Sequence, residues 1–184
     1  MSFERTFSAF LFDFDGTLAD TNEGIIATVQ ATLKDIGLPS ADASDIQFTI
    51  GLPLETCFRQ ACNVPENLVE QACSHYRDIF WDVASSTIHL FPNVQCSLET
   101  LHEQGIPMAI VSSRHNCSLN PLVQQLGIEK FFDVILGEDP AIRPKPAPDM
   151  ALKAIKMLNE KCSESYLILP KDTLVIGDTK YAIL

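Results

Sequence analysis

Two aspartates lie at the end of an apolar run, where their side chains could take part in nucleophilic and acid–base chemistry. Asp13 lies near the end of the run 7–14, and Asp15 follows the run directly before Gly16, which can take a tight turn. An ionised aspartate can attack phosphorus, and a neighbouring carboxyl group can give and take the proton of a reacting oxygen. We interpret Asp13, with a pKa near its ordinary value, as a nucleophile. Asp15 would be the general acid and base, unless both side chains simply cap the turn.

Serines and a further aspartate follow two other apolar runs. Ser112 ends the run 106–112 and Ser113 comes next, so their hydroxyl and backbone N–H groups could hold phosphate oxygens. Serine at a strand end is more often a turn residue or a helix N-cap. Asp178 follows the run 173–177 and could complete a Mg²⁺ site with Asp13 and the Asp15 carbonyl, because Mg²⁺ prefers a few hard oxygens together with waters.

Lys145 lies between two prolines in the segment 143–149, RPKPAPD. Proline restricts the backbone on both sides of this lysine, so its side chain is placed rather than free. It could neutralise Asp13 and a transferring phosphoryl group. A solvent-exposed lysine remains the default for such a residue taken alone.

The elements that must position these residues alternate along most of the chain. Four apolar runs are too short for stable helices and are typical of strands buried in a parallel sheet. Between them lie helical patterns, with Asn93 as a candidate N-cap and with Gly105 and Gly127 as stops. This order predicts a three-layer, Rossmann-like α/β core with right-handed crossovers. The runs are 7–14, 106–112, 131–137 and 173–177, and the helical patterns are 94–101, 119–126 and 150–158.

The alternation stops between residues 20 and 88, where one helical stripe follows another. We expect an all-helical cap at 20–88, inserted into a core made of 1–19 and 89–184. Such a cap would lie over the carboxyl ends of the strands, where open α/β sheets bind ligands, and could act as a lid. Trp81 is predicted to be a core residue. Arg59 and Arg77 could meet a substrate carboxylate, although exposed helix-face arginines are the commoner case.

Composition limits the function classes. The 184 residues carry 13 Lys and Arg against 24 Asp and Glu, a net charge of −11, which argues against nonspecific binding to nucleic acid or to an anionic membrane. The six cysteines form no Cys-x-x-Cys pair and are expected to be small core residues in a reducing compartment. The N-terminus does not resemble a signal peptide, and no apolar stretch is long enough to span a membrane. We therefore expect a cytoplasmic protein.

Four motifs in this order resemble those of the haloacid dehalogenase-like hydrolase superfamily, in its phosphatase branch with a helical cap. They are LFDFDGT with Asp13 and Asp15, IVSS with Ser112, RPKPAPD with Lys145, and VIGDT with Asp178. The segment TIGLPLETCF at 49–58 is similar to the specificity stretch of phosphoglycolate-phosphatase-like caps. The resemblance covers nearly the whole chain. It implies substrate binding by Gly16, Thr17, Ser112, Ser113 and Lys145, and Mg²⁺ binding by Asp13, Asp15 and Asp178.

The sequence differs from the pattern of that family in two ways. Relatives of this kind often carry a second acidic residue four positions after the last aspartate, where this sequence has Ala182. They also continue beyond the position of Leu184 with another helix and usually a strand. We therefore expect weak Mg²⁺ binding and a shortened chain.

The expected activity is that of a Mg²⁺-dependent phosphatase acting on a small phosphomonoester, phosphoglycolate-like or a sugar phosphate, through an aspartyl-phosphate at Asp13. One alternative is a sugar-phosphate mutase of the same fold, which would return the phosphate to its substrate. Another is a non-catalytic binding or regulatory protein. The expected partner is a small phosphorylated metabolite, without nucleic acid or membrane. His115, just beyond the second motif, could contact substrate or serve no function.

Overall fold

A parallel sheet forms the centre of the protein. The computed structural model describes residues 7–161 and 167–179. Its four strands follow the order β5-β4-β1-β6, so the first strand lies between the second and fourth apolar runs. All four predicted runs therefore contribute to one parallel sheet. The strands are β1 (Ala9–Phe12), β4 (Met108–Val111), β5 (Val134–Leu136) and β6 (Thr173–Ile176).

Two of these strands differ from the prediction in detail. The run 131–137 begins in a short 3₁₀ turn, Glu129–Phe131, and becomes strand only at Val134. Strand β6 was expected to be buried on both faces, but its four residues are only partly buried. It ends the sheet in the described part of the chain, so its outer side has no strand neighbour there.

The register brings the carboxyl ends of the strands to one edge. Phe12 pairs with Ile110 of β4 and with Ile176 of β6. The Asp13 N–H donates to the Ile176 carbonyl at 2.9 Å, and the Ser112 N–H donates to the Leu136 carbonyl at 2.9 Å. The polar residues that follow the strands are therefore held at the same level of the sheet.

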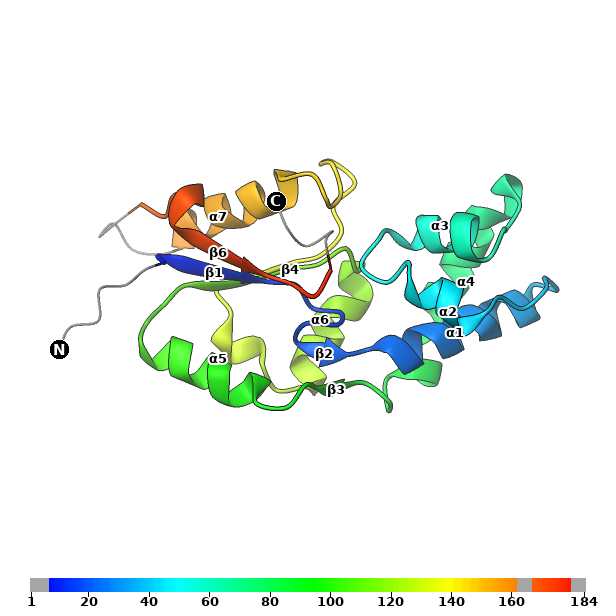
Figure 1. The fold of residues 1–184 in the computed structure, drawn as a ribbon, viewed down its shortest axis with the longest axis horizontal. Coiled ribbons are helices and arrows are strands. Elements are labelled where there is room, and N and C mark those ends of the chain that lie inside the picture. The colour runs from blue at the N-terminus through cyan, green and yellow to red at the C-terminus, as the bar shows by residue number, and fades with distance from the viewer. Residues whose placement is uncertain (1–6, 162–166, 180–184) are drawn as a thin grey trace.

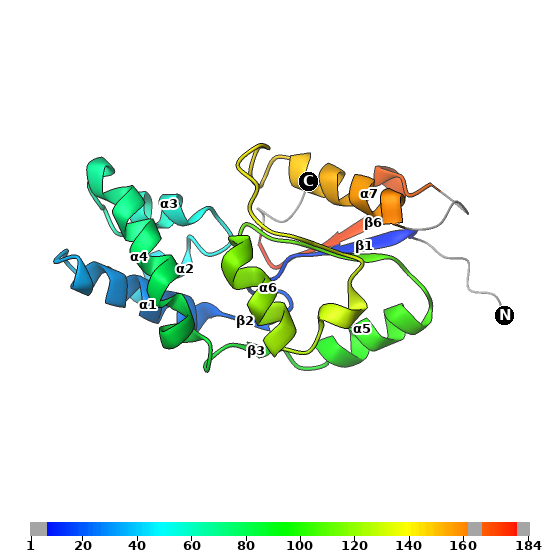
Figure 2. The same ribbon diagram turned by 180° about the vertical axis from the view of Figure 1, so that it is seen from behind.

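Helices cover both faces of the sheet and make the core three-layered (Figure 1). Helices α5 and α6 lie on one face and α7 on the other, as the reverse view also shows (Figure 2). Gly105 and Gly127 follow α5 and α6 with φ of 63° and 68°, the conformation predicted for helix stops. The bounds are α5 (Val94–Glu103), α6 (Asn116–Gln125) and α7 (Asp149–Lys161).

The predicted N-cap position of Asn93 is confirmed, without a side-chain capping bond. Asn93 precedes α5, but its side chain makes no capping hydrogen bond. Its φ of 67° places the backbone in the left-handed region, where asparagine is tolerated. Asn93 therefore occupies the predicted N-cap position, where its carbonyl accepts from the Ser97 N–H at 3.0 Å, but its side chain does not cap the helix.

The segment between β1 and α5 is an inserted helical cap. Its helices α1 and α4 pack on each other, with Val29, Leu33, Val69 and Phe80 in the buried face. A two-stranded antiparallel ribbon of β2 and β3 joins the cap to the core. Neither this ribbon nor α2 was expected, because such short elements leave no periodic pattern. The bounds are β2 (Ala19–Asp20), α1 (Asn22–Asp35), α2 (Ala43–Gln47), α3 (Leu54–Thr56), a π-helical segment (Cys57–Ala61), α4 (Glu66–Ala84) and β3 (His89–Leu90).

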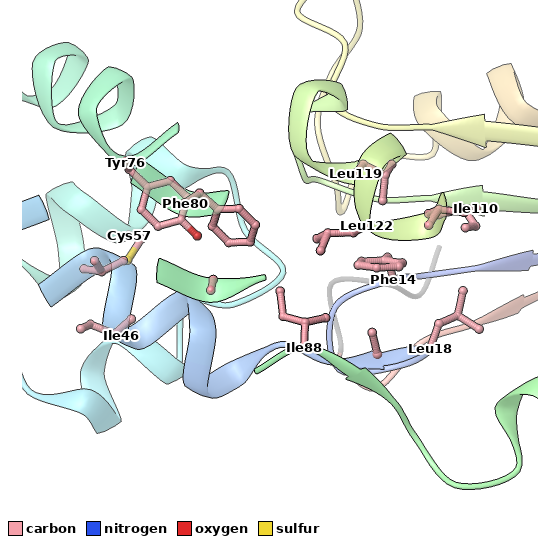
Figure 3. Close-up of a cluster of buried hydrophobic side chains, with 14 of the residues drawn as sticks. Phe14, Leu18, Ile46, Cys57, Tyr76, Phe80, Ile88, Ile110, Leu119 and Leu122 are labelled. Atoms are coloured by element: carbon pink, nitrogen blue, oxygen red, sulfur yellow. The ribbon is translucent and has the colours of Figure 1, made fainter. Parts of the chain in front are cut away.

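One hydrophobic cluster runs from the sheet into the cap. Figure 3 shows Phe14 beside Leu119 and Leu122 of α6, and Phe80 of α4 on the cap side of the same cluster. Because these side chains belong to one buried cluster, separating cap from core would expose apolar surface. The other face of the sheet packs on α7 through a second cluster that contains Leu11, Val111 and Leu158.

Two predictions about core residues are wrong. The side chain of Trp81 is 41% exposed, because its neighbour Phe80 points into the core and successive helical positions turn by about 100°. Of the five described cysteines, all free, Cys96 and Cys117 are exposed rather than buried. No helix in the described ranges combines the length and hydropathy needed to cross a bilayer.

Candidate active site

Asp13 begins a tight turn at the end of β1 and is 4% exposed. The Phe14 N–H donates to Oδ1 of Asp13 at 2.8 Å, which fixes one carboxylate oxygen. The Gly16 N–H then donates to the Ala19 carbonyl at 2.9 Å and closes the turn, with Gly16 at a φ of 78°. The side chain of Phe14 is buried between the two aspartates and anchors this turn to the core.

Lys145 reaches Asp13 from the segment before α7. Its Nζ lies 2.9 Å from Oδ1 of Asp13, and both side chains are buried. The Ala147 N–H donates to the Pro144 carbonyl at 3.0 Å, so a turn holds the lysine in place. Burial raises the pKa of Asp13, while the Lys145 ammonium opposes the rise. The expectation of an ordinary pKa for Asp13 is therefore wrong, because this carboxyl group lies in a less hydrated environment.

Ser112 and Ser113 lie at the end of β4 beside this turn. Ser112 is buried, and its Oγ accepts a hydrogen bond from the Arg114 N–H at 3.1 Å. The Oγ of Ser113 is buried and has no hydrogen-bond partner among the described residues. A buried hydroxyl without a partner is costly, so this atom is a natural contact for a ligand oxygen.

Arg114 is a site residue that the sequence analysis missed. Its Nη2 lies 2.6 Å and its Nε 3.2 Å from Oδ1 of Asp15, and Nε also contacts Oδ2 at 3.1 Å. Burial acts to lower the pKa of Arg114, but the charge and hydrogen bonds of Asp15 outweigh it and the pKa is raised. The guanidinium also lies 4.7 Å from the ring centre of Phe80 in the cap. The sequence feature that could have pointed to Arg114 is its position directly after Ser113.

The ion pair defines the state of Asp15 in this structure. Both carboxylate oxygens accept hydrogen bonds from one guanidinium, an arrangement that suits the ionised form. To hold a proton for a leaving group, Asp15 would have to release at least one of these contacts. Proton transfer to or from Asp15 therefore requires Arg114 to release one of these contacts.

Asp178 meets the same turn from the end of β6. Its N–H donates to Oγ1 of Thr17 at 3.1 Å, and this hydroxyl lies 3.2 Å from Oδ1 of Asp178. A methyl group added at Gly16 would lie 2.8 Å from Cγ of Asp178, so the carboxylate packs directly on the glycine. Thr17 and Gly16 therefore position Asp178, whatever further role they have.

The donor types at this edge fit Mg²⁺. Asp13 and Asp178 offer carboxylate oxygens, and Asp15 offers a backbone carbonyl, which are hard donors of the kind that Mg²⁺ takes together with water. The Asp15 side chain does not fit as a ligand while Arg114 binds it. The described residues contain no group of three His, Cys, Asp or Glu side chains placed to hold a metal. Ala182, expected to weaken the site, lies outside the described residues.

We expect Gly16→Ala to lower both stability and Mg²⁺ affinity. Alanine at positive φ costs about 1–2 kcal/mol, and the new methyl group would also collide with the Asp178 carboxylate. Gly105→Ala is the matched control, because Gly105 has a φ of 63° and no atom within 4 Å of its added Cβ. Urea unfolding and Mg²⁺ calorimetry on both variants measure the difference. Equal losses in the two variants would show that the Asp178 contact has no effect.

A pocket opens between the cap and the strand ends, next to Asp15. It contains about 620 Å³ of space, part of which is open to solvent. Arg77 and His115 line it, whereas Arg59 is bound to Glu66 on the exposed surface of the cap. His115 also caps α6, since its Nδ1 accepts from the Cys117 N–H at 3.2 Å. The lining residues are Asp15, Ile25, Thr49, Ile50, Gly51, Leu52, Leu54, Cys57, Tyr76, Arg77, Ser113, Arg114, His115, Ser118 and Glu138.

The fold and this edge of the sheet are those of the haloacid dehalogenase-like hydrolases. The model of that family matches residues 10–184, and the chain belongs to the family. The fold also matches a hydrolase of the haloacid dehalogenase-like family from Streptococcus pneumoniae, with a TM-score of 0.78, 29% identity, and coverage of 96% of this chain and 78% of that one. The predicted family and fold class are confirmed.

Similar sequences carry phosphatase names. The chain is 33% identical to a protein of Dickeya dadantii named "Probable phosphatase IndB", over 95% of this chain and 74% of that one. It is 28% identical to a phosphoglycolate phosphatase of Pseudomonas putida, over 92% and 62% of the two chains. It is 32% identical to the pyrophosphatase PpaX of Halalkalibacterium halodurans, over 95% and 76%. This chain thus spans less than two thirds of the Pseudomonas relative and about three quarters of the other two.

Proposed function

We propose that the protein is a Mg²⁺-dependent phosphatase that hydrolyses a small phosphomonoester through an aspartyl-phosphate at Asp13. The observation that carries this proposal is the Asp13–Lys145 pair, a buried carboxylate 2.9 Å from a buried ammonium at the carboxyl end of β1. Family membership and the phosphatase names of the similar proteins support the same reaction class. The mutase and the non-catalytic interpretations remain outcomes of the test below.

In the first step, a carboxylate oxygen of Asp13 forms a bond to phosphorus while the bond from phosphorus to the alcohol oxygen breaks. Asp15 would give its proton to that leaving oxygen. Lys145 and the Ser112 and Ser113 groups would balance and hold the phosphoryl oxygens. Bound Mg²⁺ would neutralise negative charge on the phosphoryl group and on the carboxylates.

In the second step, water attacks phosphorus and releases Asp13 and inorganic phosphate. Asp15 would take the proton of that water once Arg114 has released one of its two oxygens. Arg114 would be a positioning residue, because its guanidinium fixes both oxygens of Asp15. Its contact with Phe80 links this position to the cap.

We further propose that residues 20–88 form a cap that acts as a lid over a core of 1–19 and 89–184. The β2–β3 ribbon supports this division, because it crosses from one unit to the other at residues 19–20 and 89–90. A small phosphorylated metabolite in the cytoplasm would be the substrate. The free state of the described cysteines is consistent with a reducing compartment.

The test is a phosphatase assay on a panel of small phosphate esters, with Mg²⁺ and with a chelator in excess. We expect release of inorganic phosphate that needs Mg²⁺. Transfer of the phosphate to a second hydroxyl, with no free phosphate, would indicate a mutase. The absence of turnover on every ester, with Mg²⁺ present and the fold intact, would contradict the proposal and favour a binding protein.

A further inference from the structure

The pocket beside Asp15 is mostly apolar where the alcohol part of a phosphate ester would lie. Ile25, Ile50, Leu52 and Leu54 of the cap line it, together with the ring of Tyr76. Burying apolar carbon against these side chains is favourable, whereas burying an unpaired charge there is costly. The few charged side chains that line the pocket therefore decide which esters the protein prefers.

Both arginines that line the pocket in the described part of the chain lie next to a carboxylate. The charged residues among the described lining are Asp15, Arg77, Arg114 and Glu138. Arg114 is occupied by the buried Asp15 carboxylate. Arg77 remains, and its pairing decides how the pocket responds to a charged ligand.

Arg77 lies between two carboxylates. Its Nη2 is 3.5 Å from Oε1 of Glu55 in the cap and 4.0 Å from Oε2 of Glu138 in the core. All three side chains are about 30% exposed, so solvent screens these charges only in part. One guanidinium therefore faces two carboxylates. A third anion at this place would meet net repulsion.

The same field reaches Cys73 on the neighbouring turn of α4. Burial raises the pKa of its thiol to about 12, while Glu55 and Glu138 raise it further and Arg77 and Arg59 lower it. Since Ser113 is assigned to the phosphoryl oxygens, one unpaired donor remains for an uncharged oxygen of the alcohol part. It is the Nε of Arg77, which is buried without a hydrogen-bond partner among the described residues.

We infer that the pocket selects phosphomonoesters whose alcohol part is uncharged, with apolar carbons and at least one hydroxyl or carbonyl oxygen. It would disfavour an alcohol part that carries a carboxylate or a second phosphoryl group. This inference rests on the proposed function and specifies its substrate class. It also separates this chain from two similar proteins, whose names state phosphoglycolate and pyrophosphate as substrates.

The test compares two esters with the same two-carbon skeleton. Phosphoglycolate carries a carboxylate where 2-hydroxyethyl phosphate carries a hydroxymethyl group. We expect kcat/KM with Mg²⁺ to be at least about tenfold higher for 2-hydroxyethyl phosphate, the ratio of one well-placed repulsive contact. An equal or higher kcat/KM for phosphoglycolate would overturn the inference while leaving the proposed function standing. Failure to hydrolyse either ester or p-nitrophenyl phosphate would overturn both.

Two variants test whether the carboxylates cause the preference. Glu55→Gln and Glu138→Gln each remove one negative charge beside Arg77, and we expect each to reduce the preference severalfold and the double variant to abolish it. Glu66→Gln is the matched control, because Glu66 pairs with Arg59 at 2.8 Å on the exposed surface, away from the pocket lining. A preference that the double variant leaves unchanged, in a protein with wild-type thermal stability, would overturn the inference.

Discussion

Asp13→Asn abolishes turnover in this account and lowers the stability of the fold, because the buried Lys145 ammonium loses its carboxylate partner. The amide has the same shape as the carboxylate but is a far poorer nucleophile, so no aspartyl-phosphate can form. The Phe14 N–H and Lys145 contacts both involve Oδ1, and an amide oxygen can keep the first of them. Steady-state assays with Mg²⁺ give the rate, and thermal unfolding by circular dichroism gives the stability.

Asp20→Asn is the matched control for this variant. Asp20 lies in β2, seven positions beyond Asp13, and its Oδ1 accepts from the Asn22 N–H at 3.3 Å, a bond that an amide oxygen can keep. In the described part of the chain no hydrogen bond or ion pair joins its side chain to Asp13 or Lys145, and we expect wild-type turnover. Substantial Mg²⁺-dependent turnover by Asp13→Asn would exclude the covalent mechanism.

The second variant with a large expected effect is Asp15→Ala. It should lower both the rate of turnover and the stability of the fold. General acid–base catalysis contributes a factor of about 10²–10⁴ to the rate. We expect both the formation and the breakdown of the phospho-enzyme to slow by a factor of that order. Removing the carboxylate also leaves Arg114 charged and unpaired in the interior, which costs about 3–5 kcal/mol. Rapid-quench kinetics and urea unfolding measure the two losses.

A double variant separates these two losses. In Asp15→Ala/Arg114→Met the buried charge is gone, and methionine can pack against Phe80, so we expect much of the stability to return. The rate should stay low, because the proton donor and acceptor is still missing. If the double variant regained the wild-type rate, the acid–base role of Asp15 would be wrong and its effect purely structural.

The sequence predicts the sheet well because buried parallel strands leave a strong pattern. Each apolar run is short and is followed by a turn residue or a polar residue, and parallel strands must end at one edge. Asp13, Ser112 and Lys145 could therefore be placed together before any coordinates were known. The prolines restrict the backbone around Lys145, and the structure places its ammonium 2.9 Å from Asp13, as the sequence suggested.

Pairing between distant charges was much less predictable. Arg114 is not singled out by the sequence, because arginine is seldom buried without a partner. Its partner Asp15 lies 99 positions earlier, and nothing local in the sequence joins the two. The Glu55–Arg77–Glu138 group was missed for the same reason, since its members come from three separate segments.

Local packing explains the remaining difference between the predicted and the observed structure, the exposure of Trp81. Trp81 belongs to an apolar stretch of α4, but Phe80 and Ala84 occupy the buried side of that helix. A large aromatic residue one position along the helix faces outward, whatever its hydrophobicity. Periodicity therefore predicts the helix correctly while misplacing a residue at the border of its apolar face.

Trapping the covalent intermediate at Asp13 tests the central claim most directly. The enzyme is mixed with a good phosphate ester and Mg²⁺, quenched in acid within one turnover, and treated with borohydride, which reduces an acyl phosphate to an alcohol. Peptide mass mapping then locates the reduced residue. The account predicts homoserine at position 13, and none in the Asp13→Asn variant. Full turnover with an unmodified Asp13, or with the reduced residue at another position, would contradict it.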